Sequence, residues 1–436
     1  MSVTAGFYFA VYAGPLMVIW VIYLGIRARK QRRSVTTRDE AIASGLTEPA
    51  SLHPLIDQSL CIGCGSCVGA CPEGKILGLI GGKAELVEPS ACIGHGACRD
   101  ACPMHAITLV FGTEKRGVEI PLVQPNFETN VPGLFIAGEL GGMGLICNAV
   151  EQGRQAMESI RKLDGIGQGQ HLDVVIVGAG PAGISASLAA MEYGLRFATV
   201  EQEALGGTVA HYPRGKLVMT RPAELPLVGK MKFSEVRKEE LIEFWQGVER
   251  QTGLKINYHE RMEAITPQGS AFEVRTTRNT YVARAVLLAI GRRGTPRKLG
   301  APGEELPKVV YRMIDPEQYR GQHVLVCGGG DSALEAATSI ADEPESTVTL
   351  CYRGKAFNRA KQKNRKRVQE AEAEGRLQVL LEANVATIAE ENVQIDRQDQ
   401  LVEVPNDSVI ICAGGILPTP FLKEIGIAVE TKHGTA

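Results

Sequence analysis

The first thirty residues form the most apolar part of the chain. No residue from Ala5 to Ile26 carries a charge, and the basic run RARKQRR follows directly. An apolar helix of this length covers a hydrocarbon core of roughly 30 Å, and the alternative is a helix buried in a protein core. A signal peptide is disfavoured because no cleavage site follows. The pattern predicts a transmembrane anchor over residues 1–33 of a single-pass protein of the cytoplasmic (inner) membrane, with the remaining domains in the cytoplasm.

Short apolar runs alternate with helical patterns in the second half of the chain. LDVVIV (172–177) precedes a glycine cluster and the helical pattern ISASLAAMEYG, and FATV follows. The same order recurs in HVLVC (323–327), LEAATSIA and STVTLCYR. This alternation predicts strand–helix–strand units with parallel strands, so the fold class is α/β. Residues 34–54, which are small and polar, are expected to form a linker.

Composition adds three points to this picture. A chain of 436 residues is long enough for two or three domains. Its net charge of −2 offers no field for holding nucleic acid, so no nucleic-acid partner is expected. Of the 11 cysteines, seven lie between Cys61 and Cys102 at spacings that suit a metal site in a reducing compartment. The others are isolated and are expected to be structural: Cys147, Cys327, Cys351 and Cys412.

The clustered cysteines follow a repeated pattern. Cys61, Cys64, Cys67 and Cys71 precede a proline, and the same spacing returns at Cys92, His95, Cys98 and Cys102. This repeat resembles a two-cluster bacterial ferredoxin module, a small α+β domain, over residues 55–112. The resemblance implies two [4Fe–4S] clusters, the first held by Cys61, Cys64, Cys67 and Cys102 and the second by Cys71, Cys92, Cys98 and His95. Zinc is the competing metal for such pairs, but the proline after each run favours iron–sulfur.

His95 stands where the ferredoxin family has a cysteine. Imidazole is neutral and thiolate is not, so a histidine-ligated cluster would hold an electron more readily. The alternative is that His95 turns away and leaves a three-iron [3Fe–4S] cluster. The sequence leaves both open.

The first glycine cluster has the order expected of a dinucleotide-binding turn. Gly178 makes the turn after the strand, Gly180 lets the backbone approach a pyrophosphate, and Gly183 lets the helix pack on the strand. The helix N-terminus supplies free N–H groups for the phosphates. Glu201 ends the next strand, where it can accept hydrogen bonds from ribose hydroxyls.

A second turn of this kind opens with Gly328 and Gly330, and Asp331 and Ser332 begin the helix after it. The following strand ends in Arg353 rather than in an acidic residue, with Arg359 close behind. Arginine at this position favours the 2′-phosphate of NADP over NAD.

Two such units, with VARAVLLAIGRRG between them and VIICAGGILPTPFL after the second, resemble the thioredoxin reductase superfamily of two-dinucleotide flavoproteins. The stretches TRPAELPLVGKMKFSEVRKEELIEFW and YRGKAFNRAKQKNR look closest to the bacillithiol disulfide reductase branch. The resemblance implies two Rossmann-like domains, the first for FAD and the second for NADP or NAD. It also implies that Gly207 and Thr208 lie against the isoalloxazine, together with His211 and Tyr212.

One motif of that superfamily is displaced. Its members end on a TxxPGxFxAGD segment, whereas this chain has the equivalent from Thr129 to Gly138 and Glu139, before the first glycine turn. We infer a circular permutation; the alternative is a chance resemblance in a ferredoxin tail. The expected domains are the permuted segment (113–166), the FAD domain (167–307), the NAD(P)H domain (308–412) and the return to the FAD domain (413–436).

The function expected from these motifs is electron transfer. Disulfide reductases need a cysteine pair facing the flavin, and no CxxC occurs outside the cluster segment. The prediction is therefore a membrane-anchored, FAD-dependent NAD(P)H oxidoreductase, similar to a ferredoxin–NADP reductase, without a catalytic acid or base. It would exchange electrons with a redox protein, a cytochrome or a quinone, and a homodimer is allowed. The alternatives are reduction of a small disulfide through Cys147, and a non-catalytic electron-transfer or redox-sensing subunit of a membrane complex.

Overall fold

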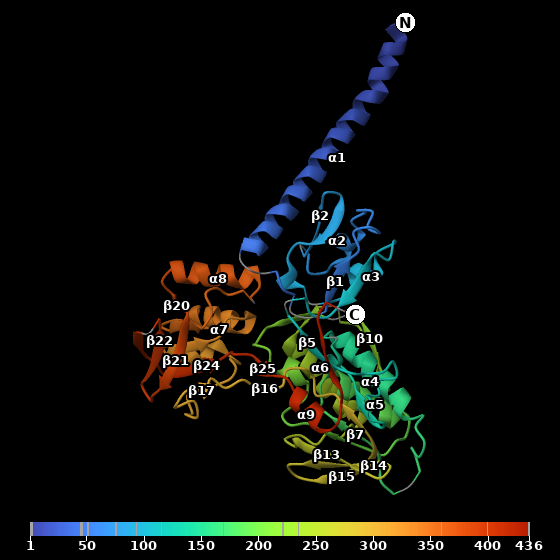
Figure 1. Ribbon diagram of the computed structural model, residues 1–436, viewed down its shortest axis with the longest axis vertical. Coiled ribbons are helices and arrows are strands. Elements are labelled where there is room, and N and C mark those ends of the chain that lie inside the picture. The colour runs from blue at the N-terminus through green and yellow to red at the C-terminus, as the bar shows by residue number, and fades with distance from the viewer. Residues whose placement is uncertain are drawn as a thin grey trace. The chain divides into compact units, whose positions relative to one another are not determined.

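The structure is a computed structural model of the chain. It describes residues 3–43, 47–49, 52–74, 76–92, 94–114, 116–142, 144–168, 170–219, 222–233, 235–358, 360–398 and 400–434, with the side chains of 3–11 and of Met219 left out. Two compact units are present, one of residues 1–117 with 433–436 and one of residues 118–432. Each is described by itself (Figure 1).

The first unit begins with one long helix, α1 (Val3–Ala43). It continues through residues 34–43, which the sequence had suggested as part of a linker. A membrane span needs about 20 consecutive apolar residues. Within the described part of the chain, no helix is long and apolar enough to cross a membrane. The predictions of a transmembrane helix in the fold, of a membrane anchor and of a single-pass location in the cytoplasmic membrane are therefore wrong.

The last turns of α1 pack on the cysteine-rich module. Ser34 lies so close to Gly78 that a Cβ built there would stand 2.6 Å from the Ser34 Cβ. One turn on, Arg38 Nη1 lies 3.4 Å from Glu85 Oε2. These contacts explain why the helix does not end where the apolar residues end.

The cysteine-rich module is built from two similar halves. Its outer strands, β1 (His53–Ile56) and β4 (Ile107–Val110), pair antiparallel, and a hairpin joins β2 (Leu77–Ile80) to β3 (Lys83–Leu86). Each half contains one short α-helix within its cysteine run, α2 (Ser66–Ala70) and α3 (Ala97–Asp100). The 3-10 helix η1 (Pro89–Ala91) precedes the second run.

The flavin half of the second unit is built on a mixed sheet in the order β13-β14-β15-β7-β8, with β6 also beside β15. Its strands are β6 (Leu134–Ile136), β7 (Leu172–Val177), β8 (Phe197–Val200), β13 (Met262–Gln268), β14 (Ala271–Thr276) and β15 (Thr280–Leu288). Strands β6, β15, β7 and β8 run parallel. β6 and β7 are almost fully buried, and β15 and β8 are buried toward their C-terminal ends. Parallel strands of this kind have continuous apolar sequences, because both faces of the sheet are covered.

The displaced segment takes part in this sheet. β6 pairs parallel with β15, in the register Leu134 to Val286. The helix after it, α4 (Ile146–Ile160), packs on α5 (Pro181–Glu192), where a Cβ on Gly153 would stand 2.1 Å from the Ala182 carbonyl oxygen. The pairing is the one that the inferred permutation requires.

The return of the chain to the flavin half is also visible. After crossing on the short pair β16 (Thr295–Pro296) and β25 (Gly415–Ile416), the chain forms α9 (Thr419–Glu424) and then β26 (Val429–Lys432). β26 pairs antiparallel with β5 (Val118–Pro121). The remaining flavin-half elements are η2 (Glu139–Gly141), η3 (Gly207–His211), β9 (Leu217–Met219), β10 (Ala223–Leu225), β11 (Gly229–Met231), β12 (Glu235–Arg237) and α6 (Lys238–Thr252).

The nucleotide half is a parallel sheet in the order β17-β24-β18-β19-β20. Its elements are β17 (Val309–Val310), η4 (Pro316–Tyr319), β18 (His323–Cys327), α7 (Asp331–Ala341), β19 (Thr347–Tyr352), α8 (Gln362–Ala373), β20 (Leu377–Leu381) and β24 (Ser408–Ile411). An antiparallel sheet of β21 (Ala383–Ile388), β22 (Asn392–Arg397) and β23 (Gln400–Pro405) accompanies it. The α/β architecture with two dinucleotide-binding halves agrees with the sequence prediction.

Candidate functional site

The first glycine turn is shaped by close backbone contacts. Gly178 has φ +107°, and a Cβ on it would stand 2.5 Å from the carbonyl oxygen of Ala289, directly after the neighbouring strand β15. A Cβ on Gly183 would stand only 1.8 Å from the Gly178 carbonyl oxygen. Neither position can take a side chain while the strand, turn and helix keep this packing.

A cavity of about 620 Å³ opens in front of this turn. Gly138, Gly180 and Gly207 are among its lining residues. Gly180 and Gly207 face each other so closely that a Cβ on Gly207 would stand 3.1 Å from the Gly180 Cα. The bare backbone at the N-terminus of α5 suits a pyrophosphate, and the volume lies within the range of cofactor sites. The residues present therefore fit FAD.

Glu201 lines this cavity and is buried. Its carboxylate accepts hydrogen bonds from the backbone N–H groups of Ala179 at 2.7 Å and Glu203 at 2.9 Å. Burial raises the pKa of this carboxyl, and these hydrogen bonds oppose the effect. The side chain is thus held in one orientation beside the turn, as hydrogen bonding to ribose hydroxyls requires.

The displaced motif reaches the same cavity. Gly138, Glu139 and Thr208 all line it. A Cβ on Gly138 would meet the Ala182 Cβ at 3.1 Å, so the motif lies directly against the first glycine turn. Burial raises the pKa of Glu139, and the positive charge of Arg292 partly offsets this. The fold brings together residues that lie far apart in sequence.

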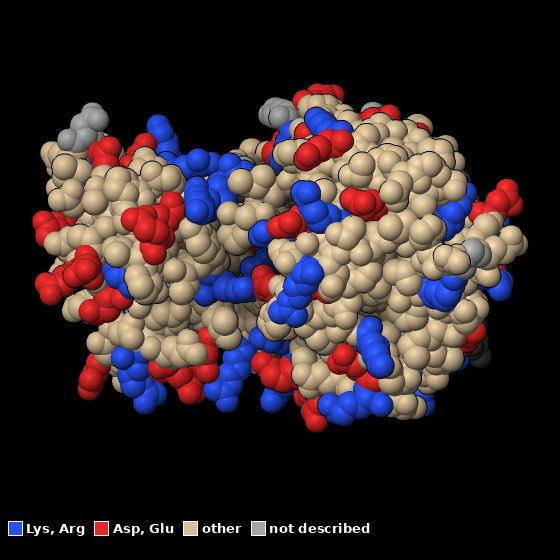
Figure 2. Space-filling view, turned by 90° about the horizontal axis from the view of Figure 1, so that it is seen from below, with Lys and Arg blue, Asp and Glu red and all other residues tan. Residues whose placement is uncertain are grey.

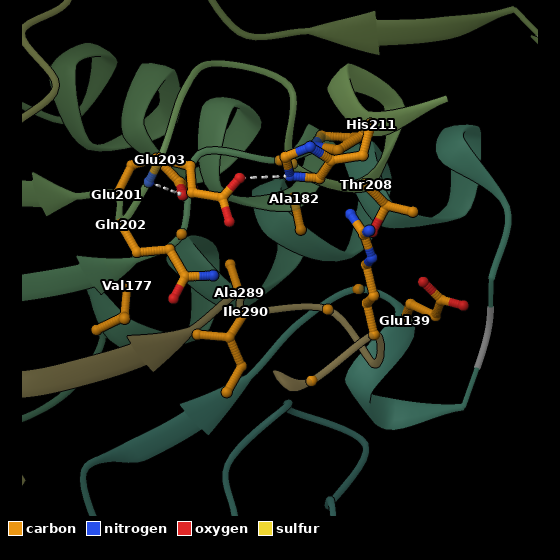
Figure 3. A pocket seen from close by; sticks show the side chains of 18 of the residues that line it. Glu139, Val177, Ala182, Glu201, Gln202, Glu203, Thr208, His211, Ala289 and Ile290 are labelled. Carbon is orange, nitrogen blue, oxygen red and sulfur yellow. Dashed lines mark hydrogen bonds and ion pairs between the residues drawn. The ribbon is translucent and has the colours of Figure 1, made fainter. Parts of the chain in front are cut away.

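A charged group at the cavity was missed by the sequence prediction. Glu203 Oε2 lies 2.9 Å from His211 Nε2 (Figure 3). The same oxygen accepts a hydrogen bond from Arg312 Nη2 at 3.1 Å. Arg312 also contacts His211 Nδ1, and Arg293 lines the same cavity. Figure 2 shows further basic side chains along the line between the two halves of this unit. No local motif links these residues, because Arg312 lies 109 positions from Glu203 in sequence.

This group makes stability depend on pH. Burial, followed by the charge of Arg312, lowers the pKa of His211 to about 4 from 6.5. Between these values the unfolded chain binds a proton that the folded chain does not, so the free energy of unfolding falls as the pH is lowered through this window. We expect His211→Gln to weaken that dependence, measured as the urea midpoint at pH 7 and pH 5. Equal pH dependence in both proteins would contradict the assignment.

The second glycine turn has the same backbone form. Gly328 has φ +147°, and a Cβ there would stand 2.5 Å from the Cys412 carbonyl oxygen, while Gly330 has open space. Ser332 is exposed in the first turn of α7. Asp331, in contrast, accepts hydrogen bonds from Lys361 N and Asn364 Nδ2, both at 2.8 Å. Its carboxylate therefore joins α7 to the start of α8, a contact that the turn motif alone did not reveal.

Arg353 follows directly after β19, and its side chain is exposed. Tyr352 before it lies against Gly329 and stacks on Phe357 with ring centroids 5.6 Å apart. An arginine at this strand end, near the glycine turn, suits the 2′-phosphate of NADP. Arg359 lies outside the described residues.

The predicted cluster ligands collect around two separate cavities in the first unit. One is lined by Cys61, Cys64, Cys67 and Cys102, together with apolar residues. The cysteine from the second run thus lies beside the first three, as the ferredoxin resemblance implies.

The other cavity is lined by Cys71, Cys92, Cys98 and His95. Burial raises the pKa of Cys98 to about 11, as it does for Cys67 in the first cavity. Within the described residues no three such side chains lie close enough to hold a single metal ion. An iron–sulfur cluster is wider than one ion, and its thiolates lie correspondingly further apart. Both sets of donors therefore fit clusters, whose binding would release the thiol protons.

The isolated cysteines lie elsewhere. Cys327 and Cys351 are buried on neighbouring strands of the nucleotide half, where burial raises the pKa of both thiols. Burial also raises the pKa of the Cys412 thiol, to about 12. Cys147 lies in the first turn of α4, and its neighbours Ile146 and Ala149 line the flavin cavity while it does not.

Comparison with protein families agrees with this geometry. Residues 175–435 match the model described as pyridine nucleotide-disulphide oxidoreductase. The chain belongs to the pyridine nucleotide-disulphide oxidoreductase family. Residues 53–103 of this oxidoreductase match the 4Fe–4S dicluster domain. The predicted superfamily, the cofactors FAD, NADP and two [4Fe–4S] clusters, and the class of FAD-dependent NAD(P)H oxidoreductase are confirmed.

Curated relatives of the oxidoreductase include a ferredoxin–NADP reductase of Thermus thermophilus. It is 32% identical over 273 residues, 60% of this chain and 78% of the relative. A ferredoxin–NADP reductase of Ignicoccus hospitalis is 32% identical over 186 residues, and the chain spans 57% of its length. Among solved structures, the bacillithiol disulfide reductase Bdr of Staphylococcus aureus matches with a TM-score of 0.51 and 24% identity, over 60% of this chain and 81% of that one. That likeness shows the shared fold.

Proposed function

We propose that this oxidoreductase passes electrons between NADPH, FAD and its two iron–sulfur clusters, and exchanges them with a ferredoxin-type redox protein. The observation that supports this most is the combination in one chain of a flavin-sized cavity and two cysteine-lined cavities. The ferredoxin–NADP reductase names of its curated relatives point to the same partner class.

The residues of the flavin half have separable tasks in this proposal. The N–H groups at the start of α5, beside Gly180, bind the pyrophosphate. Glu201 orients the adenosine ribose, and Glu139 and Thr208 position the reactive end. When bound, FAD supplies the exchange between two-electron hydride transfer and single-electron transfer.

In the nucleotide half, Gly328, Gly330 and the N-terminus of α7, including Ser332, hold the NADP phosphates, and Arg353 pairs with the 2′-phosphate. Asp331 keeps α7 and α8 in place. The thiolates of Cys61, Cys64, Cys67 and Cys102 hold the first cluster. Those of Cys71, Cys92 and Cys98 hold the second.

Reduction of a small disulfide is less well supported. Such chemistry needs a thiol at the flavin, and no described residue lining the flavin cavity is a cysteine. The position of Cys147 outside the lining therefore weighs against it.

The proposal is tested by anaerobic titration of the purified full chain with NADPH, with NADH as comparison. We expect the flavin absorbance to bleach and the electron paramagnetic resonance signals of reduced clusters to follow. If a cytochrome or a quinone added as acceptor were reduced faster than ferredoxin, that acceptor would replace ferredoxin as the proposed partner. A chain that holds flavin and iron but does not oxidise NADPH would instead be a non-catalytic subunit.

Nucleotide preference gives a sharper prediction. Arg353→Ala is expected to raise the KM for NADPH by about tenfold or more, since a hydrogen bond to a charged group contributes about 1.5–3 kcal/mol. The KM for NADH should stay unchanged. Lys366→Ala, which removes an exposed cation paired with Glu370 on α8, is the matched control. Equal effects of Arg353→Ala on both nucleotides would show that the arginine does not contact the 2′-phosphate.

A further inference from the structure

The two cluster cavities have the same backbone but different donors. Gly63 and Gly65 flank Cys64 with φ of +69° and +78°, and Gly94 and Gly96 flank His95 with φ of +77° and +77°. Both second glycines precede a short helix, α2 and α3 respectively. The side chain of His95 thus leaves the backbone as that of Cys64 does.

His95 also points toward the cavity rather than to solvent. It lines the cavity with Cys71, Cys92 and Cys98, and its side chain is only 10% exposed. The imidazole is therefore already placed among the three thiols. This argues against a side chain that has turned away.

A second difference between the repeats accompanies the first. The residue two positions after Cys102 is Met104, which lines the first cavity, whereas the residue two positions after Cys71 is Glu73. Glu73 Oε1 lies 3.6 Å from His95 Nε2, and the Glu73 side chain is 18% exposed. The chain therefore places a carboxylate beside the histidine and a thioether near the equivalent cysteine. A carboxylate in this relation orients a ligating imidazole and raises its basicity.

We propose that His95 is the fourth ligand of the second [4Fe–4S] cluster and that Glu73 is the residue that positions it. This rests on the proposed function, because it assumes that the second cavity holds a cluster. Replacing one thiolate by a neutral imidazole removes a negative charge from the cluster, so the second cluster takes an electron at a higher potential than the first. Electrons entering the module then collect on the second cluster.

The direct test uses the full chain prepared without oxygen and labelled with ¹⁵N-histidine. Pulsed electron paramagnetic resonance of the reduced protein should show a ¹⁵N coupling on one of the two cluster signals. His95→Cys should keep the cluster and lose the coupling. His105→Asn is the matched control, because His105 is exposed and its φ of +49° suits asparagine; it should keep the coupling.

A redox titration gives an independent readout. At a fixed potential, His95→Cys should lower the ratio of reduced to oxidised second cluster at least tenfold, or about 59 mV for one electron, and leave the first cluster unchanged. Glu73→Gln should weaken retention of the second cluster against an iron chelator by about tenfold. Asp100→Asn, an exposed carboxylate of the same module, should not change it.

The outcomes separate this inference from the proposed function. A three-iron signal in the unaltered protein, without nitrogen coupling, would overturn the ligand assignment, as would a His95→Ala variant with unaltered cluster signals. If Glu73→Gln retained the second cluster against the chelator as well as the unaltered protein does, Glu73 would have no positioning role. Absence of bound iron and sulfide altogether would instead overturn the proposed function.

Discussion

Gly183→Ala is expected to leave the protein almost without bound FAD. The added Cβ would stand 1.8 Å from the Gly178 carbonyl oxygen, so α5 must move away from β7 and the pyrophosphate loses its N–H donors. We expect bound FAD per chain to fall at least about tenfold, equivalent to about 1.4 kcal/mol of binding. Overpacking of this kind also costs about 1–3 kcal/mol of stability or more. The flavin-to-protein absorbance ratio measures the first effect and urea unfolding the second.

Two further variants keep this prediction testable if Gly183→Ala fails to fold. Gly180→Ala meets no atom nearer than 3.9 Å, so it should fold and lose FAD only because its methyl group enters the cavity. Gly247→Ala lies on α6 with open space around it and should bind FAD normally while gaining about 0.5–1 kcal/mol. Full FAD content in Gly180→Ala would show that the pyrophosphate does not approach this residue.

Cys67→Ser is expected to remove the first cluster and to leave the flavin reaction intact. Cys67 is buried and lines the first cavity, and serine replaces its thiolate with a poor iron ligand. Bound iron should fall by about half, because each of the two clusters contributes four irons. NADPH should still bleach the flavin, whereas electron delivery to ferredoxin should be lost. Iron analysis and stopped-flow absorbance measure these separately.

The matched control is Cys147→Ser. Cys147 does not line the flavin cavity, so the variant should retain iron, flavin and ferredoxin reduction. A large loss of activity in Cys147→Ser with normal iron content would favour thiol chemistry. Unaltered ferredoxin reduction in Cys67→Ser would show that the first cluster is not on the electron path.

Several features could be predicted from sequence because they depend on short stretches of chain. The turn at Gly178 needs only a strand, three glycines and a helix in order. The cysteine spacings likewise specify a module whose outer strands must pair, and that pairing brings Cys102 beside Cys61. Both are local patterns repeated within the chain, so they are visible without a structure.

The membrane prediction, in contrast, depended on where one helix ends. The uncharged run of residues 5–26 suggested an anchor that ends before a linker at residues 34–54. The described helix instead continues past Arg27 to Ala43 and packs on Gly78 through Ser34. Hydrophobic pattern alone did not show where the helix ends.

The sequence by itself determined the two nucleotide-binding turns, the paired cysteine runs and the displaced motif, because each is encoded by residues within a few positions of one another. Only the tertiary structure decided that Glu203, His211 and Arg312 form one charged group, that Asp331 joins two helices, and that Glu73 lies beside His95. These contacts join residues from separate elements, and they exist only after strands and helices have packed. Chain folding, rather than any motif, brings such side chains within hydrogen-bonding or ion-pairing distance.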